Sequence, residues 1–144
     1  MIKIYTDGSC LKNPGGKGAC AYIIIERGIL LHKKVYKKDC TTNNRMELSA
    51  ILVAFLFVIE NNISGEITLY TDSQYALKGI TQWMQKWKLK GWRKKGEDIP
   101  NRDLWEKLHA AYEKVKHIEL EWVKAHSTNG WNNYVDELCE TAYQ

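Results

Sequence analysis

Two short segments of the chain have nearly the same sequence, and each ends in an aspartate. Residues 2–7 read Ile-Lys-Ile-Tyr-Thr-Asp, and residues 67–72 read Ile-Thr-Leu-Tyr-Thr-Asp. Both follow a strand pattern, which places each aspartate on the same face as the tyrosine two residues before it. If the two strands are parallel neighbours, about 4.8 Å apart, the carboxylates repel each other unless a cation lies between them or one is protonated. The pair is therefore a candidate divalent-cation site.

Each aspartate also has a simple structural explanation. Asp7-Gly8 is a common turn pair, and Asp72 followed by Ser73 fits the N-cap of a helix. Taken singly, each of these explanations is the better one. Only the joint placement of the two carboxylates favours chemistry.

A second candidate region is the segment 86–95, which holds six basic residues and no acidic ones. Trp87 and Trp92 lie within it, and Trp83 lies just before it. Basic residues interleaved with aromatic ones suit a polyanion with flat faces. On charge alone, a solvated basic loop explains the segment equally well.

The elements that carry these residues follow from hydrophobic patterning. We expect strands at residues 2–7, 19–26, 30–37, 66–71 and 117–123, helices at 42–59, 73–88 (broken near Gly79), 101–116 and 131–143, and loops at 91–100 and 125–129. The first three strands form an antiparallel meander. The helix between the third and fourth strands indicates a parallel pairing there, through a right-handed crossover. The sequence thus predicts an α/β fold with a mixed five-stranded sheet flanked by helices.

Composition limits the class of protein. A length of 144 residues, 44% of them hydrophobic, fits one globular domain. The longest apolar run, residues 51–59, falls far short of the roughly 20 residues that span a bilayer, and no signal peptide is visible. The four cysteines have no metal-binding spacing and are expected as free thiols. We therefore expect a cytoplasmic protein that does not contact a membrane. The cysteines are Cys10, Cys20, Cys40 and Cys139.

Seven motifs occur in order along essentially the whole chain. They are Thr6-Asp7-Gly8-Ser9-Cys10, Asn13-Pro14-Gly15, Thr42-Asn43-Asn44-Arg45-Met46-Glu47-Leu48, Thr71-Asp72-Ser73-Gln74-Tyr75, Gly79-Ile80-Thr81-Gln82-Trp83, Trp122-Val123-Lys124-Ala125-His126 and Asp136-Glu137-Leu138. Any one of them is a weak signal, but the ordered set is highly specific. Together they closely resemble the type 1 ribonucleases H of bacteria. The segment 127–131 departs from the bacterial pattern.

The resemblance implies the ribonuclease H-like fold, with sheet order 3-2-1-4-5 and strand 2 antiparallel, in a single domain of residues 1–144. It implies an endoribonuclease that hydrolyses the RNA strand of RNA–DNA hybrids by two-metal-ion catalysis and leaves 5′-phosphate and 3′-hydroxyl ends. The family uses four carboxylates and two Mg²⁺ ions, for which Mn²⁺ can substitute. By position, these carboxylates match Asp7, Glu47, Asp72 and Asp136, and His126 matches the family histidine that moves protons or assists product release.

The resemblance also implies a monomer with two sets of substrate contacts. One set lies near the metals and distinguishes RNA by its 2′-hydroxyl; it matches Gly8, Cys10, Asn13, Asn43, Asn44 and Gln74. The other set is the family's basic protrusion, which grips the DNA strand through its phosphates. It matches Trp83, Trp87, Lys88, Lys90, Trp92 and Arg93.

Some of these assignments have alternatives. Asn44-x-x-Glu47 also fits a capping box, and both roles can hold. Without the resemblance, His126 is an ordinary loop histidine and Asp136 a surface charge. The chain could also be the ribonuclease H module of a reverse transcriptase, although its self-contained length favours a free-standing enzyme. A hybrid-binding domain without catalysis conflicts with the four carboxylates. A sugar kinase or ATPase with this topology conflicts with the small size and the lack of a glycine-rich phosphate loop.

Overall fold

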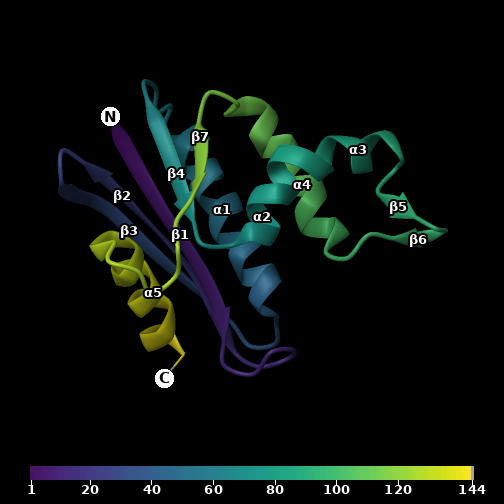
Figure 1. Cartoon of the computed structure of the whole chain (residues 1–144), viewed down its shortest axis with the longest axis horizontal. Coiled ribbons are helices and arrows are strands. Elements are labelled where there is room, and N and C mark those ends of the chain that lie inside the picture. The colour runs from purple at the N-terminus through teal and green to yellow at the C-terminus, as the bar shows by residue number, and fades with distance from the viewer. Residues whose placement is uncertain (144) are drawn as a thin grey trace.

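The computed structural model describes residues 1–143, and its centre is a five-stranded sheet (Figure 1). The strands are β1 (Ile2–Cys10), β2 (Gly18–Glu26), β3 (Ile29–Lys38), β4 (Ile67–Thr71) and β7 (Glu119–Trp122), with a separate short hairpin of β5 (Arg93–Lys94) and β6 (Glu97–Asp98). The helices are α1 (Asn43–Glu60), α2 (Gln74–Lys78), the π-helical turn η1 (Gly79–Trp83), α3 (Met84–Leu89), α4 (Arg102–Lys114) and α5 (Gly130–Ala142).

The strand order in the large sheet is β3-β2-β1-β4-β7. Strand β2 runs antiparallel to β1 and β3, whereas β1, β4 and β7 are mutually parallel. This confirms the predicted mixed sheet and its order. The predicted pairing of the third and fourth strands is wrong, because β4 pairs with β1. Strand β2 lies between β1 and β3, and α1 crosses β2 and β1 to deliver the chain to the free edge of β1.

Helices α1 and α5 cover opposite faces of the sheet (Figure 1). Successive residues of a strand point to opposite faces of the sheet, so they contribute alternately to two hydrophobic cores, one on each face. Ile4 and Ile24 pack with α1, whereas Tyr5 and Ile23 pack with Val135 and the rest of the buried face of α5. The inner strands β1, β2 and β4 are therefore buried on both faces, whereas the edge strands β3 and β7 are largely exposed.

Helix α1 begins one residue later than predicted and uses a different cap. The Thr42 side chain accepts a hydrogen bond of 3.1 Å from the backbone N–H of Arg45. The predicted capping box from Asn44 to Glu47 is therefore wrong: Asn44 is exposed, and Glu47 is the fifth residue of the helix. The physical reason is that Thr42, two residues earlier, already satisfies the first free N–H groups. The Glu47 carboxylate is therefore not used to cap the helix and is available for another role.

The predicted helix over residues 73–88 is divided into α2, η1 and α3. The expected break at Gly79 is a π-helical turn, and the Trp105 ring lies where a side chain at this glycine would be, since a Cβ there would come within 2.0 Å of the ring. The predicted loop 91–100 contains the β5–β6 hairpin. In the described part of the chain, no helix is both long and apolar enough to cross a membrane. The cysteines are free thiols, as predicted.

Candidate active site

The two similar segments found in the sequence are adjacent, in-register strands. Parallel pairing of β1 with β4 matches Ile2 with Ile67 and continues to Tyr5 with Tyr70. The two tyrosine rings stack with centroids 4.7 Å apart and an interplanar angle of 13°. Each aspartate lies two residues beyond its tyrosine. The shared register therefore brings Asp7, within β1, to the same level as Asp72, which directly follows the carboxyl end of β4.

Glu47 joins these two aspartates from α1. Oxygen atoms of Asp7, Glu47 and Asp72 all lie within 4.8 Å of one another. The close approach of α1 depends on Gly8, because a Cβ there would come within 2.2 Å of the Met46 backbone carbon. The missing side chain at Gly8 thus allows the helix to place its carboxylate beside the strand.

Asp136 and His126 complete the group from the other face of the sheet. Asp136, on α5, lies close enough to Asp7 for its charge to help raise the pKa of the Asp7 carboxyl. His126 Nδ1 lies 3.4 Å from Asp136 Oδ2, and its side chain is 74% exposed. The structure therefore brings all four predicted carboxylates together and sets the predicted histidine at the solvent edge, next to Asp136.

Within residues 1–143, no lysine or arginine forms an ion pair with these four carboxylates, and this changes the acidity of Asp7 and Glu47. Burial, reinforced by the charges of Asp72 and Asp136, raises the pKa of Asp7 to about 9. Burial and the charges of Asp7 and Asp72 raise the pKa of Glu47 well above its usual value. The Gly8 backbone N–H offsets both effects only in part. Like charges held this close ionise together only if a cation accompanies them.

One oxygen atom of the cluster is a separate argument for a metal site. The Glu47 Oε1 oxygen is buried and has no hydrogen-bond partner within residues 1–143. A buried carboxylate oxygen without a donor is costly, and a cation would satisfy it. The donors are all carboxylate oxygens, which suit a hard ion such as Mg²⁺. The donor set and this unpartnered oxygen therefore fit a divalent metal site.

Three of the predicted substrate residues are tied together beside the cluster. The backbone N–H of Cys10 donates to Asn43 Oδ1 at 2.8 Å, and the backbone N–H of Asn43 donates to Asn13 Oδ1 at 3.1 Å. These bonds connect the loop after β1 to the first turn of α1. Asn44 and Gln74 are exposed at the starts of α1 and α2. The predicted polar groups thus lie on the same three elements as three of the carboxylates, namely β1 with its following loop, the start of α1, and the start of α2 just after Asp72.

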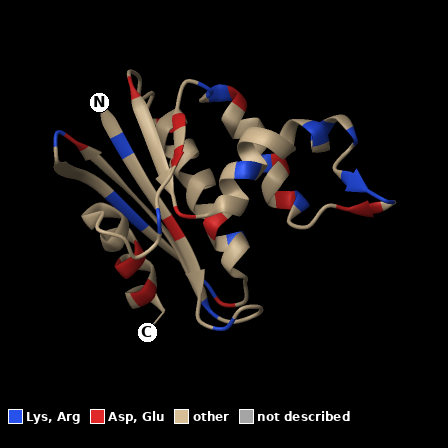
Figure 2. Ribbon diagram, viewed as in Figure 1, with Lys and Arg blue, Asp and Glu red and all other residues tan. Residues whose placement is uncertain are grey.

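The second predicted contact surface forms a separate hollow of about 390 Å³ on α3 and the hairpin. Figure 2 shows the basic residues gathered along α3 and β5, away from the acidic residues at the centre of the sheet and on α5. Its lining consists of Trp83, Lys86, Trp87, Lys90, Arg93, Lys94 and Lys95. Lys88 is exposed outside this lining. Trp92 packs edge-on against His109, with ring centroids 5.9 Å apart, and so anchors the start of the hairpin.

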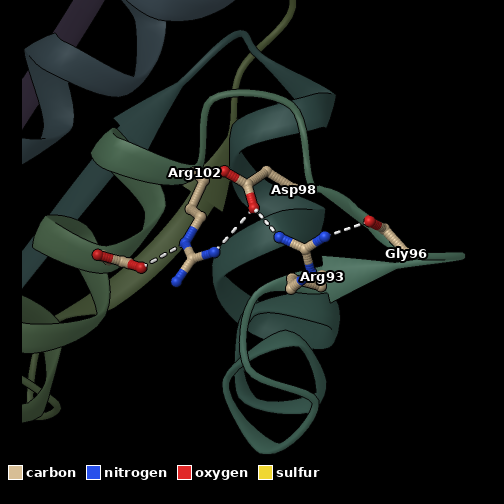
Figure 3. A network of polar contacts seen from close by, with 5 residues as sticks. Arg93, Gly96, Asp98 and Arg102 are labelled. Atoms are coloured by element: carbon tan, nitrogen blue, oxygen red, sulfur yellow. Dashed lines mark hydrogen bonds and ion pairs between the residues drawn. The ribbon is translucent and has the colours of Figure 1, made fainter.

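An arginine–carboxylate network holds this hairpin against α4 (Figure 3). Asp98 Oδ1 accepts hydrogen bonds from Arg93 at 3.0 Å and from Arg102 at 2.8 Å. Arg102 Nε also donates to Glu106 at 2.7 Å, and Arg93 donates to the carbonyl of Gly96. The predicted contact residue Arg93 is thus held in place by an acidic neighbour.

Asn132 falls at a position where the family that the sequence resembles often has a polar residue, but the sequence did not indicate a role for it. It is 1% exposed, and neither polar atom of its side-chain amide has a hydrogen-bond partner in the described chain. It lies on α5 one turn before Asp136, so the two residues share a helix face. Its burial was not predictable, because only the fold shows which face of α5 packs against the sheet.

The sheet order and the acidic cluster at the ends of its two central strands define the ribonuclease H-like class of enzymes. The family model for RNase H matches residues 1–144. The chain belongs to the ribonuclease H family and is a ribonuclease H enzyme.

Known proteins of this family resemble the chain closely. Ribonuclease H of Hahella chejuensis (strain KCTC 2396) is 46% identical over 141 residues, which cover 96% of this chain and 90% of that protein. The crystal structure of LC9-RNase H1, described as a type 1 RNase H with the type 2 active-site motif, has a TM-score of 0.85 at 29% identity and covers 98% of this chain and 71% of that one. LC11-RNase H1, solved in complex with an RNA/DNA hybrid, has a TM-score of 0.76 at 20% identity over the full length of both chains, and shares the fold.

Proposed function

We propose that this enzyme is an endoribonuclease that hydrolyses the RNA strand of RNA–DNA hybrids by two-metal-ion catalysis and leaves 5′-phosphate and 3′-hydroxyl ends. The observation that carries the proposal is the group of buried Asp7 and half-buried Glu47 and Asp72, whose oxygens lie within 4.8 Å of one another. The structural neighbour LC11-RNase H1 was solved with an RNA/DNA hybrid, which supports this class of substrate.

Two Mg²⁺ ions, or Mn²⁺ in their place, fit the carboxylates. Glu47 and Asp72 would hold one ion and Asp136 the other, with Asp7 shared between them. When bound, such ions activate a water nucleophile and stabilise the leaving oxygen of the phosphodiester. The carboxylates themselves fix where the scissile phosphate lies, because β1, β4 and α1 hold them rigidly. Gly8 contributes by allowing the approach of α1.

His126 acts at the solvent edge of the same site. Its contact with Asp136, at 3.4 Å, orients the ring towards the carboxylates while most of the side chain stays exposed. A histidine in this position accepts or donates a proton and exchanges it with water. Its place in the loop before α5 suits a residue that also assists product release.

The two strands of the hybrid are recognised differently. The RNA strand lies over the polar groups near the carboxylates, where hydrogen bonds to its 2′-hydroxyls distinguish it from DNA. These groups belong to Gly8, Cys10, Asn13, Asn43, Asn44 and Gln74. The DNA strand lies on the basic protrusion, where Trp83, Trp87, Lys88, Lys90 and Arg93 contact its phosphates and sugars without reading sequence, and Trp92 supports the surface. We further propose that the enzyme acts as a single domain of residues 1–144, as a monomer, in the cytoplasm.

A cleavage assay tests the proposal. The protein is incubated with Mg²⁺ and an end-labelled RNA–DNA hybrid, and in parallel with the same RNA single-stranded and with duplex DNA. We expect cutting of the RNA in the hybrid alone, products with 5′-phosphate and 3′-hydroxyl ends, and no cutting after chelation of the metal. Equal cutting of all three substrates would disprove the substrate assignment, and full activity in a chelator would disprove the metal mechanism.

A further inference from the structure

We propose that a second basic pocket, at the end of β3, binds a backbone phosphate of the RNA strand a few nucleotides away from the scissile bond. The pocket has a volume of about 180 Å³, and we call it the lysine pocket after Lys17, Lys37 and Lys38 in its lining. This inference rests on the proposed function and deepens it, because it adds a contact outside the two substrate surfaces described above.

The charge of the lysine pocket suits an anion. Its lining contains the three lysines and one acidic residue, Asp39, and all four side chains are exposed. Within residues 1–143, none of these four residues takes part in an ion pair. Lysine binds phosphate as a point charge and selects no base. The excess of positive charge around one hollow therefore favours a backbone phosphate as the ligand.

Two hydroxyl groups supply a neutral donor beside the lysines. Tyr143 also lines the pocket, and its hydroxyl oxygen lies 3.0 Å from that of Ser9, at hydrogen-bond distance. A bond between two hydroxyls uses only one of their two protons, so one O–H remains available to an acceptor. The same bond fixes the residue that follows α5 to β1, two residues beyond Asp7. The wall of the pocket is thereby attached to the strand that carries a carboxylate of the active site.

The strand register gives the position of the pocket relative to the carboxylates. Gly18 lines the pocket and pairs with Cys10 on one side and with Lys38 on the other. Cys10 lies three residues beyond Asp7 on β1, and Lys38 lies two strands away from Cys10. At the usual spacings of strands, the pocket is roughly 10 Å along the sheet and 10 Å across it from Asp7. Phosphates follow one another every few ångströms along a strand, so this separation corresponds to a few nucleotides.

The neighbours of the pocket favour the RNA strand as its occupant. The backbone N–H of Leu11 donates to the Lys17 carbonyl at 2.7 Å, and that of Thr41 donates to the Gly16 carbonyl at 3.1 Å. These bonds hold the pocket against the loop that carries Asn13, one of the proposed RNA contacts. The α3 helix and the β5–β6 hairpin, which we assign to the DNA strand, project from the side of the molecule opposite α5 (Figure 1).

Protection of an edge strand is the alternative explanation for these lysines. Strand β3 is at the edge of the sheet, and lysines on such a strand prevent pairing with another chain. This explanation applies equally to Lys34, which is exposed on the same strand but lines a different hollow with Phe57 of α1. It does not explain why Lys17, which precedes β2, joins Lys37 and Lys38 around one hollow. Lys34 is therefore the matched control for the pocket lysines.

The test maps the positions at which the RNA is cut. The RNA strand is end-labelled and annealed to a DNA strand that extends beyond it at both ends. Cleavage is followed with Mg²⁺ at a hybrid concentration far below KM. A cut in the middle of the RNA requires that RNA also lies at the pocket, whereas a cut close to one RNA end leaves only DNA within its reach. Internal and terminal cuts are therefore compared within one reaction.

We expect the pocket variants to slow internal cuts selectively. Lys37→Ala should slow them about threefold, and its combination with Lys38→Ala about tenfold, because each variant loses phosphate contacts. Cuts nearest one RNA end should change by less than about twofold. Lys17→Ala, on a different segment, should give the same pattern as Lys37→Ala. Lys34→Ala removes the same charge from β3 and should leave all cuts unchanged. Melting temperatures of the variants verify that they are folded.

The possible results separate the pocket from the function on which it rests. Equal slowing at every position would overturn the RNA assignment, because DNA reaches the pocket wherever the RNA is cut. No slowing in any pocket variant, or an equal effect of Lys34→Ala, would overturn the pocket and leave the proposed function intact. A wild-type protein that cuts no hybrid would overturn both.

Discussion

Acidic residues of this enzyme have opposite surroundings in two regions, both in their exposure to solvent and in the charge of their neighbours. In the active site, Asp7 is 3% exposed and has two other carboxylates as its charged neighbours within reach of one metal ion. At the base of the protrusion, the Asp98 side chain is 56% exposed and receives hydrogen bonds from two arginines. The first arrangement concentrates negative charge away from water, and the second neutralises it where water already screens it.

The difference indicates what each region is for. Buried like charges raise the free energy of the folded protein, so their presence is explained by a ligand that compensates them. Exposed ion pairs contribute only about 0–1 kcal/mol each, so the Asp98 network serves to shape the hairpin. Asp→Asn substitutions in the two regions keep the side-chain shape and change only the charge. They therefore compare the regions directly.

Asp7→Asn should have the largest effect. If Asp7 is the shared metal ligand we propose, its loss removes several kcal/mol of transition-state stabilisation, which corresponds to a decrease in cleavage rate of at least ~10³-fold. Hybrid binding should survive, because the contacts to both strands remain. Single-turnover cleavage and equilibrium binding of a labelled hybrid measure the two effects. Unchanged turnover would refute the metal-bridging role.

The same substitution should stabilise the protein without metal. Because the pKa of Asp7 is raised from 3.8 to about 9 on folding, the folded state binds more protons than the unfolded state between these values. The contribution of the Asp7 carboxyl to folding stability is therefore fully present below pH ~4 and is lost as the pH rises towards about 9. In a chelator, Asp7→Asn should be more stable than wild type by on the order of 1–3 kcal/mol at pH 8, with a smaller difference at pH 5. Thermal unfolding at the two pH values checks this.

His126→Ala should have the next largest effect, because this side chain lies at the exposed edge of the cluster. We expect turnover to fall by about 100-fold, which is less than the decrease expected for Asp7→Asn. Hybrid binding should not change, because the contacts to both strands do not involve this side chain. Complete inactivity would mean that His126 does more than move a proton.

The residues of this site that could be predicted without the resemblance are those that belong to a short local sequence pattern. The strand repeat places Asp7 and Asp72 side by side through their register alone. Asp136 was identified only by resemblance, because nothing local shows that α5 crosses the sheet beside Asp7. The capping prediction failed because Asn44 and Thr42 are both good caps, and packing decides between them. The hydrogen bonds of Asn101 to Tyr75 and Arg45 could not be predicted, because these partners are 26 and 56 positions away and only the folded chain brings them together.

Lys90→Ala should have a moderate, salt-dependent effect. It removes one phosphate contact, so hybrid affinity should fall a few-fold, and the slope of log affinity against log salt should decrease by about 0.9. Lys3→Ala is the matched control, an exposed lysine near the opposite end of β1 from Asp7. Titrations at several salt concentrations measure both variants. An identical slope in the two would remove Lys90 from the DNA-side surface.

Asp98→Asn should have the smallest effect. The amide oxygen still accepts hydrogen bonds from Arg93 and Arg102, and the lost charge was exposed, so stability should change by less than about 1 kcal/mol, or a shift in Tm of at most about 4 °C. Hybrid affinity should be unchanged or up to about twofold tighter, because Arg93 now meets a phosphate without a competing carboxylate. A loss of affinity or cleavage comparable with that of Asp7→Asn would show that both acidic regions take part in the chemistry. The contrast between a buried cluster for catalysis and an exposed network for shape would then be wrong.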